Sequence, residues 1–566
     1  MTPDSAPRPW IDILTGRYAL LALSALALLL LIAFPLAEML RRSFVDEGAF
    51  SLAHYVEVFT EPRNLRPFLN TALLGALTVA GSLALGIPAA WLVARTDIPT
   101  RGLVEAMFLI PYLIPPFIGA ISWIQLLSPR IGYANKLWGW VFGTGTGPFD
   151  IYTLSGLTFV MVLHAYPFVY LTVRSALDRM DPSLEEAAAM AGAGRFQVLR
   201  HITLPMVLPG IAAGALLVLV DTIANFGIPA LIGMQARFYV LTTQIYSYVY
   251  LGTFDGIRLA AALSSVLMFV AGAGVLLNDF WLRRRQYTTM TGKSTRPARV
   301  ALGRWRGPVI ALLALYGVAV IVAPMLAVLA SAFLKAWGLP LRWENLTFDN
   351  FNYILFEYDL TRRAMTNSLL LALGAATIAT GFGAVLAYLS SRTRMKGRQI
   401  VDVLVTLPHA IPGMVVALSM ILAWSGVYGI NLYNTIWIIL VAYIARYVFF
   451  GFRNSVAALA QVHPSLEEAA YMSGANWLQS FRDVVVPLIR PGLLAGWFLI
   501  FMPTLRELTI SILLWGPHTP TIGVAVFEMQ DAGYFTASAA MATILLAVVL
   551  VGDFLLRRLT GARLST

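Results

Sequence analysis

Twelve stretches of this chain are long and apolar enough to cross a membrane, and this pattern excludes most other architectures. A membrane helix needs roughly 20 mostly apolar residues to cross about 30 Å of hydrocarbon. Outer-membrane strands would instead be alternating segments of about ten residues. The predicted spans are approximately 18–40, 69–94, 103–127, 152–174, 207–232, 257–282, 308–333, 366–391, 400–424, 431–453, 489–514 and 536–557.

Two of these spans are irregular. Pro111, Pro115 and Pro116 interrupt 103–127, and the pair Arg506 and Glu507 lies within 489–514. The first apolar stretch is too long for a typical signal-peptide core, so we expect it to remain as a membrane anchor.

The composition agrees with a polytopic membrane protein. Hydrophobic residues make up 58% of the 566 residues and charged residues 12%, against about 25% charged residues in soluble domains. The net charge of +11 would suggest nucleic acid in a soluble protein, but the basic residues lie between apolar segments. The chain contains no cysteine, which excludes disulfides and thiolate metal sites.

The distribution of basic residues predicts the orientation. Short cytoplasmic loops carry an excess of Lys and Arg. With a cytoplasmic N-terminus, the inside segments contain 26 of the 40 Lys and Arg residues, the spans contain two and the outside segments contain twelve. We therefore expect both termini to face the cytoplasm.

The chain is a tandem repeat. Asn70, Arg95, Pro111 and Pro115 recur at one constant spacing as Asn367, Arg392, Pro408 and Pro412, and Arg95–Thr96 matches Arg392–Thr393. Farther along, Pro205, Pro209 and Gly210 recur at a shorter spacing as Pro487, Pro491 and Gly492, so the first half has an insertion near 128–151. Each half has six spans, which gives parallel repeats with a pathway between them. The predicted halves are 1–290 and 307–566, joined by a basic linker at 291–306.

A polar loop between the fourth and fifth spans of each half repeats almost unchanged. Pro182-Ser-Leu-Glu-Glu-Ala-Ala188 recurs as Pro464-Ser-Leu-Glu-Glu-Ala-Ala470. The first copy continues as Glu186-Ala-Ala-x-x-x-Gly192 and, after nine further positions, Ile202-x-Leu-Pro205. The second has Glu468-Ala-Ala-x-x-x-Gly474 and then Val484-Val-Val-Pro487, a mild departure. These motifs resemble the EAA loop of ABC-importer permeases, the inner-membrane components of binding-protein-dependent transporters.

The resemblance implies a fold and a set of partners. The fold is an all-α polytopic membrane protein with 12 transmembrane helices in two parallel six-helix pseudo-repeats, the type I ABC importer permease fold. The loops 182–205 and 464–487 would be coupling helices on two copies of an ABC ATPase subunit, which bind ATP and Mg. A periplasmic or extracellular substrate-binding protein would dock outside, on the loops near 43–68, 128–151, 233–256, 335–365 and 515–535. The location would be the bacterial inner membrane, in contact with lipid and not with nucleic acid.

The local sequence of each loop predicts a helix–turn–helix. Ser183 with Glu186, and Ser465 with Glu468, fit capping boxes, and Gly192 and Gly474 can end the first helix in a left-handed turn. A second short helix would cover about 194–201. For the two glutamates, capping alone is an alternative to docking. The candidate coupling residues are Glu186, Ala187, Ala188, Gly192, Glu468, Ala469, Ala470 and Gly474.

We predict that the chain is not an enzyme and binds no cofactor itself. Gly292-Lys293-Ser294 looks like the end of a P-loop, but position 287 is Tyr where the motif requires glycine. The six histidines have no paired metal-ligand spacing, so the sequence assigns no metal site. Nothing in the sequence resembles a hydrolytic triad.

Ionisable groups within spans are costly and are therefore functional candidates. The candidate pathway residues are Asp221, Asn225, Arg506 and Glu507, and Arg446 lies in the tenth span. For Arg506 and Glu507, a structural pairing within the bundle is an equal alternative.

The stretches 221–229, 239–246 and 506–517 resemble the fused permeases associated with iron(III) uptake. Related permeases carry thiamine, polyamines, aminoethylphosphonate or phosphorylated organic solutes, so these cargoes remain open. The rival hypothesis is a secondary transporter driven by an ion gradient. It would need acidic ion sites at broken midplane helices and would be active without ATPase partners.

Overall fold

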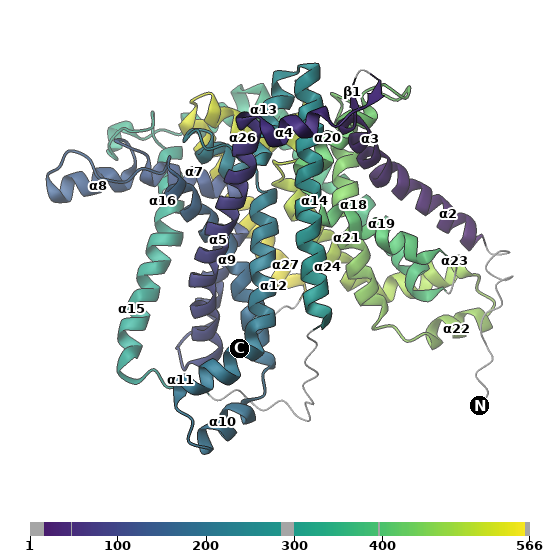
Figure 1. Ribbon diagram of the computed structural model, residues 1–566, viewed down its shortest axis with the longest axis horizontal. Coiled ribbons are helices and arrows are strands. Elements are labelled where there is room, and N and C mark those ends of the chain that lie inside the picture. Colours follow the sequence, from purple (N-terminus) through teal and green to yellow (C-terminus); the bar gives the residue numbers. More distant parts are fainter. Residues whose placement is uncertain (1–15, 47, 285–298, 394–396, 561–566) are drawn as a thin grey trace.

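The computed structural model describes residues 16–46, 48–284, 299–393 and 397–560, which fold almost entirely into helices (Figure 1). The two strands of this part of the chain, β1 (Val45–Asp46) and β2 (Ala49–Phe50), pair antiparallel. Gly292-Lys293-Ser294 and residues 291–298 of the predicted linker lie outside the described residues.

The helices of the first half follow in chain order. They are α2 (Arg17–Leu28), η1 (Leu29–Ala33), α3 (Phe34–Ser43), α4 (Ala53–Thr60), α5 (Pro62–Arg95), α6 (Arg101–Leu113), α7 (Pro116–Leu127), α8 (Tyr133–Phe142), α9 (Leu154–Arg179), α10 (Pro182–Met190), α11 (Arg195–Val198), η2 (Leu199–Thr203), α12 (Leu204–Ala224), η3 (Pro229–Gly233), α13 (Leu241–Leu251) and α14 (Phe254–Arg284).

The second half repeats the order with small differences. Its helices are η4 (Gly303–Trp305), α15 (Arg306–Tyr316), η5 (Gly317–Val322), α16 (Ala323–Ala332), η6 (Trp343–Asn345), α17 (Asp349–Asn352), η7 (Tyr353–Glu357), α18 (Asp359–Arg392), α19 (Arg398–Ala410), α20 (Gly413–Trp424), α21 (Ile436–Leu459), α22 (Ser465–Met472), α23 (Trp477–Gln479), η8 (Ser480–Val485), α24 (Val486–Leu505), α25 (Ser511–Leu514), α26 (Ile522–Asp531) and α27 (Phe535–Thr560).

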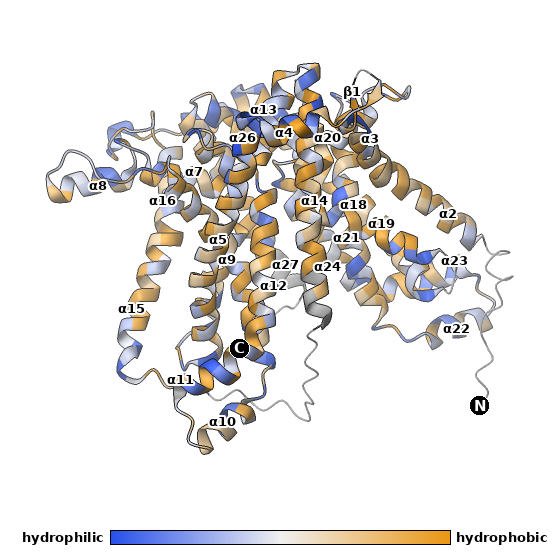
Figure 2. Cartoon of the chain, viewed as in Figure 1, coloured by the Kyte–Doolittle hydropathy of each residue, from blue (hydrophilic) through white to orange (hydrophobic). Residues whose placement is uncertain are grey.

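Ten helical runs in the described part of the chain are long and apolar enough to cross a membrane, and two bent pairs bring the number to twelve. Apolar residues dominate the middle of these runs, whereas polar residues gather at the ends of the bundle (Figure 2). This distribution matches helices that satisfy their own backbone groups in lipid. The prediction of twelve apolar spans in an all-α chain is confirmed.

The two bent pairs correspond to predicted spans 103–127 and 400–424, neither of which is a straight helix. α6 and α7 meet at 98°, and α19 and α20 meet at 113°. Pro115 and Pro412 stand at the breaks. Proline removes a backbone donor and clashes with the preceding turn, so it breaks a helix. The repeated prolines thus give each half the same broken third span.

Predicted spans 207–232 and 489–514 also end earlier than expected. α12 stops at Ala224 and α24 stops at Leu505, and each is followed by non-helical residues and a short turn of helix, η3 or α25. In both halves, therefore, the chain leaves the fifth span where the polar candidates Asn225 and Glu507 occur.

Each half packs its first span against the other half. Within the halves, α5, α9 and α12 form one bundle and α18, α21 and α24 form the equivalent one. α3 packs on α14 of its own half and on α20 of the other, and α16 packs on α27 of its own half and on α7 of the other. This exchange holds the halves together around a shared centre.

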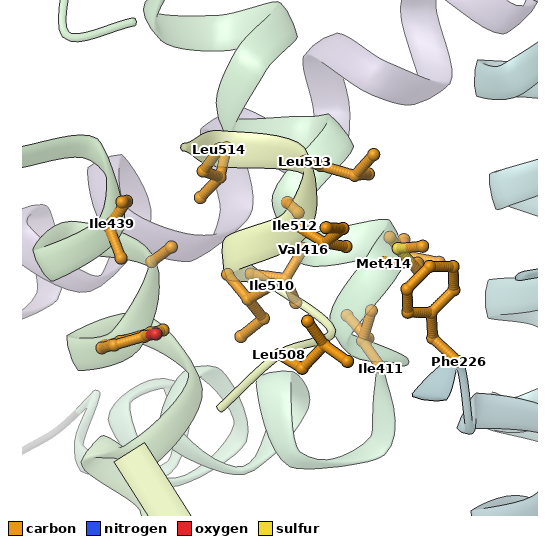
Figure 3. Packing of buried hydrophobic residues seen from close by; sticks show 14 of the residues in the cluster. Phe226, Ile411, Met414, Val416, Ile439, Leu508, Ile510, Ile512, Leu513 and Leu514 are labelled. Carbon is orange, nitrogen blue, oxygen red and sulfur yellow. The ribbon is translucent and has the colours of Figure 1, made fainter. Parts of the chain in front are cut away.

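The buried core extends to this centre. Phe226 of the first half lies beside Met414 and other buried apolar side chains of α20 and of the segment after α24 (Figure 3). Glycine allows close approach of two helix backbones: a Cβ at Gly383 of α18 would lie 2.5 Å from the backbone nitrogen of Phe452 in α21. Small residues permit such approach between membrane helices.

Candidate functional site

The repeated loops 182–205 and 464–487 lie at the same end of the bundle, which we call the loop end (Figure 1). Each first helix, α10 or α22, ends at a glycine with positive φ, +86° at Gly192 and +88° at Gly474. The amide of Ala193 bonds the Ala188 carbonyl, and the amide of Ala475 bonds that of Ala470, both at 3.0 Å. These bonds complete the Schellman geometry, and the predicted left-handed stops are confirmed.

The second helix of each loop is not a separate element. α11 passes through η2 into α12, and α23 passes through η8 into α24. Each loop is therefore a short helix and a turn, followed directly by a long span. The loop and the fifth span are therefore joined by continuous helix.

The predicted capping boxes are wrong. The residue that caps α10 is Asp181, whose carboxylate accepts from the Ser183 amide at 2.9 Å. Proline is favoured at the first helical position, so Pro182 starts the helix one residue before Ser183. In the second loop, the Ser465 hydroxyl contacts His463 Nδ1 at 2.8 Å instead of capping α22.

The motif glutamates Glu186 and Glu468 are exposed, as are Ala187 and Ala469, whereas Ala188 and Ala470 are half-buried. Capping does not account for the two carboxylates, because Asp181 caps α10 and no side chain caps α22.

Exposed apolar side chains occupy equivalent positions in both loops. Met190 is 85% exposed and Met472 is 88% exposed. Leu184 and Leu466, and Phe196 and Leu478, are exposed in the same paired manner. Exposed apolar patches mark interaction sites, and here the same patch occurs twice.

The glutamates before the motif turn inward, and the sequence analysis missed them. Glu185 Oε2 lies 3.4 Å from Arg95 Nη1 at the end of α5, and Glu467 Oε1 lies 3.1 Å from Arg392 Nε at the end of α18. Glu185 also accepts from the Thr203 hydroxyl at 2.6 Å, and Glu467 from Tyr388 at 3.0 Å. The recurrence of Arg95 as Arg392, which marks the tandem repeat, is the sequence signal for these pairs.

The second candidate region is a cavity of about 210 Å³ within the bundle. It brings together all four predicted pathway residues, although they come from different halves. Its lining is Tyr112, Pro116, Phe117, His164, Asp221, Asn225, Gly227, Tyr447, Pro503, Arg506, Glu507, Leu508 and Thr509. These residues belong to the broken third span, the fourth span and the end of the fifth span.

Two of the four residues accept hydrogen bonds from backbone amides of the segment that follows the fifth span. Asn225 Oδ1 accepts from the Ile228 amide at 3.2 Å. Glu507 Oε2 accepts from the Ile510 amide at 2.9 Å and from the Ser511 amide at 3.3 Å. In the repeat register that aligns Pro205 with Pro487, Asn225 corresponds to Glu507 and Ile228 to Ile510. The same hydrogen bond therefore occurs in both halves.

The intramembrane arginines bond carbonyls at the helix breaks. Arg506 Nη1 donates to the Leu113 carbonyl between α6 and α7. Arg446 Nη1 donates to the carbonyls of Pro408, in the last turn of α19, and of Ile411, between α19 and α20. A broken helix leaves carbonyls unpaired, and such groups are costly in lipid. Arg506 and Glu507 therefore both make hydrogen bonds to the backbone within the bundle, as the structural alternative predicted. Both also line the cavity.

Asp221 has a different environment. Its Oδ2 lies 3.9 Å from His164 Nε2 and accepts no hydrogen bond from the described residues. In the described part of the chain, no three His, Cys, Asp or Glu side chains form a group that could hold a metal ion.

Comparison with known proteins agrees with the repeated architecture. The model of the binding-protein-dependent transport system inner membrane component family matches residues 82–326 and 379–562. A putative ferric transport system permease protein FbpB 1 of Haemophilus influenzae is 27% identical over 512 residues, covering 87% of this chain and 77% of that protein.

Two further relatives differ in the cargo they are named for. An Fe(3+)-transport system permease protein FbpB 2 of Haemophilus influenzae is 26% identical, covering 94% of this chain and 97% of the relative. The sulfate transport system permease protein CysT of Escherichia coli is 27% identical over 45% of this chain and 88% of its own length. The family match covers most of the chain, and this protein belongs to the binding-protein-dependent transport system inner membrane components, the permeases of ABC importers.

Proposed function

We propose that this permease carries iron(III) across the bacterial inner membrane, with ATP hydrolysed by partner subunits bound at its two loops. The observation that carries the coupling proposal is the duplicated loop surface, in which Glu186, Met190 and their counterparts Glu468 and Met472 are exposed. A surface repeated in both halves fits two copies of one ATPase subunit. An ion-driven transporter has no use for such loops.

The inward glutamates supply the mechanical link in this proposal. Glu185 and Glu467 pair with arginines that end the second spans, α5 and α18, while the loops continue into the fifth spans. When the ATPase subunits close on ATP, each loop would carry two spans of its half with it. The halves would then alternate access around the cavity that contains Asp221 and Glu507.

The positions of the loops predict how the complex is oriented in the membrane. The loop end and both termini would face the cytoplasm, and the opposite end would receive a loaded periplasmic binding protein. Iron(III) is favoured because two relatives that match most of this chain are named for ferric transport. Thiamine, polyamines, aminoethylphosphonate and phosphorylated solutes are the alternative cargoes.

Proteoliposomes test this proposal. The chain, its ATPase subunit and a candidate binding protein are reconstituted, and ATPase stimulation is measured with the binding protein loaded with iron(III) or with each alternative solute. We expect stimulation and internal accumulation only with iron(III). Stimulation by another loaded binding protein, with none by the ferric one, would refute the cargo.

A further inference from the structure

The polar groups around the cavity differ in how far the protein itself uses them. Asn225 and Glu507 accept backbone amides beyond the fifth spans, and Arg506 donates to the Leu113 carbonyl. These three side chains maintain the helix breaks that shape the cavity. Their polarity therefore has a structural explanation that needs no cargo.

Asp221 has no such role among the described residues. It lies in the last turn of α12, before the helix ends at Ala224, and lines the cavity with His164 and Tyr112. Its Oδ2 is buried without a hydrogen bond, and its nearest cationic group is His164 at 3.9 Å, which is charged only when protonated. The Asp221 side chain is 29% exposed, so this unpaired oxygen belongs to a carboxylate that is only partly buried. Ionisable groups within membrane spans are costly and are functional candidates.

The carboxylate is also present in one half only. In the repeat register that aligns Asn225 with Glu507, the position equivalent to Asp221 is Pro503, which lines the same cavity. If Asp221 had a structural role common to both repeats, we would expect a polar residue at the equivalent position of the second repeat. Asn225 has such an equivalent, Glu507. Asp221 instead gives the cavity a carboxylate that only the first half supplies at this repeat position, beside Glu507, whose carboxylate already accepts the Ile510 and Ser511 amides.

We propose that Asp221 is the contact for a cationic cargo in transit through this cavity, and that it disfavours oxyanions there. This inference rests on the proposed function only in that the cargo passes through the cavity. The Asp221 carboxylate can attract a cation without enclosing it, since no group of three acidic or imidazole side chains in the described residues could hold a metal ion. Transport requires binding weak enough to permit release.

The test compares Asp221→Asn, Asp221→Glu and wild type in the complete complex with ATPase and ferric-loaded binding protein. Asp402→Asn is the control, because Asp402 accepts from the Ser390 hydroxyl and neither residue lines the cavity. We expect Asp221→Asn to lower iron imported per ATP by about tenfold or more, the effect of losing one modest contact. Its ATPase stimulation should stay within about twofold of wild type, and Asp221→Glu should retain most uptake.

Three outcomes would contradict the inference. Uptake of iron(III) per ATP at the wild-type level in Asp221→Asn would overturn the inference. Equal import of an oxyanion by wild type and by Asp221→Asn would also overturn it. If Asp221→Asn fails to assemble, Asp221→Ser is measured in the same way. Failure of both to assemble, with Asp221→Glu intact, would assign the carboxylate to the fold. If wild type imports a cation other than iron(III), the proposed cargo fails while the role of Asp221 is still tested on that cation.

Discussion

The buried ion pair between Glu467 and Arg392 permits a quantitative prediction about the second loop. Glu467→Gln removes the charge and preserves the shape, and the new side-chain carbonyl can still accept from Tyr388. The carboxylate is 8% exposed and the Arg392 side chain is 16% exposed, so the variant leaves a guanidinium largely buried without its counterion.

The magnitude follows from that burial. Removing one partner of a buried pair costs about 3–5 kcal/mol. Arg392 also donates to the carbonyls of Leu459 and Val462, which remain, so we expect the lower end, about 3 kcal/mol. A difference of about 1.4 kcal/mol is tenfold in an equilibrium, so local opening of α22 should increase by about a hundredfold. Glu185→Gln should have a smaller effect, because Glu185 is 22% exposed.

Hydrogen exchange of the amides that close α22, those of Gly474 and Ala475, measures this opening in the membrane-embedded chain. The control is Asp483→Asn in the same loop, whose pair with Arg482 is 53% and 81% exposed and is worth at most about 1 kcal/mol. The reasoning is refuted if Glu467→Gln accelerates exchange no more than Asp483→Asn does.

Three further predictions concern the loops and the orientation of the chain. Gly474→Ala should weaken co-purification of the ATPase subunit, because the φ of +88° at this position costs an L-residue about 1–2 kcal/mol. The added Cβ meets no atom within 4 Å, so the effect comes from the backbone and not from a clash. Unchanged binding of the ATPase subunit would remove the docking role of this loop. The Ser183 amide lowers the pKa of Asp181, so this cap stabilises α10 above the ordinary carboxyl range and is lost as pH falls through the lowered pKa. Acid should therefore lower the protection of α10 amides, measured relative to their intrinsic exchange rates at each pH, in wild type but not in Asp181→Asn, which caps without titrating. In the cysteine-free chain, an impermeant maleimide added to intact spheroplasts should label Trp140→Cys but not Met190→Cys, both highly exposed positions; the reverse would invert the proposed orientation.

The parts of the fold that sequence predicted are those set by local chemistry. Apolar length identified the spans, and the left-handed stops at Gly192 and Gly474 follow from the backbone freedom of glycine. The repeated prolines marked the place where the third span of each half breaks, although only the first was expected to be irregular. Pro182 also explains the wrong capping boxes, because it moves the start of α10.

The contacts between distant segments could not be read from the sequence. In the Glu-Glu pairs of the loops, nothing local indicates that Glu185 turns toward α5 while Glu186 faces outward. The carbonyl partners of Arg446 and Arg506 exist only once the broken spans are assembled. The candidate pathway residues were found from their cost in lipid, but the contrast between Asp221 and Glu507 required their hydrogen bonds.

The central claim is that this permease is driven by ATP through its two loops. Its most direct test is iron(III) accumulation in proteoliposomes that contain the chain, its ATPase subunit and the ferric-loaded binding protein, with ionophores present to collapse all ion gradients. The account predicts that accumulation persists with ATP and disappears when the ATPase subunit is omitted. Accumulation that requires an ion gradient and proceeds without the ATPase subunit would contradict it.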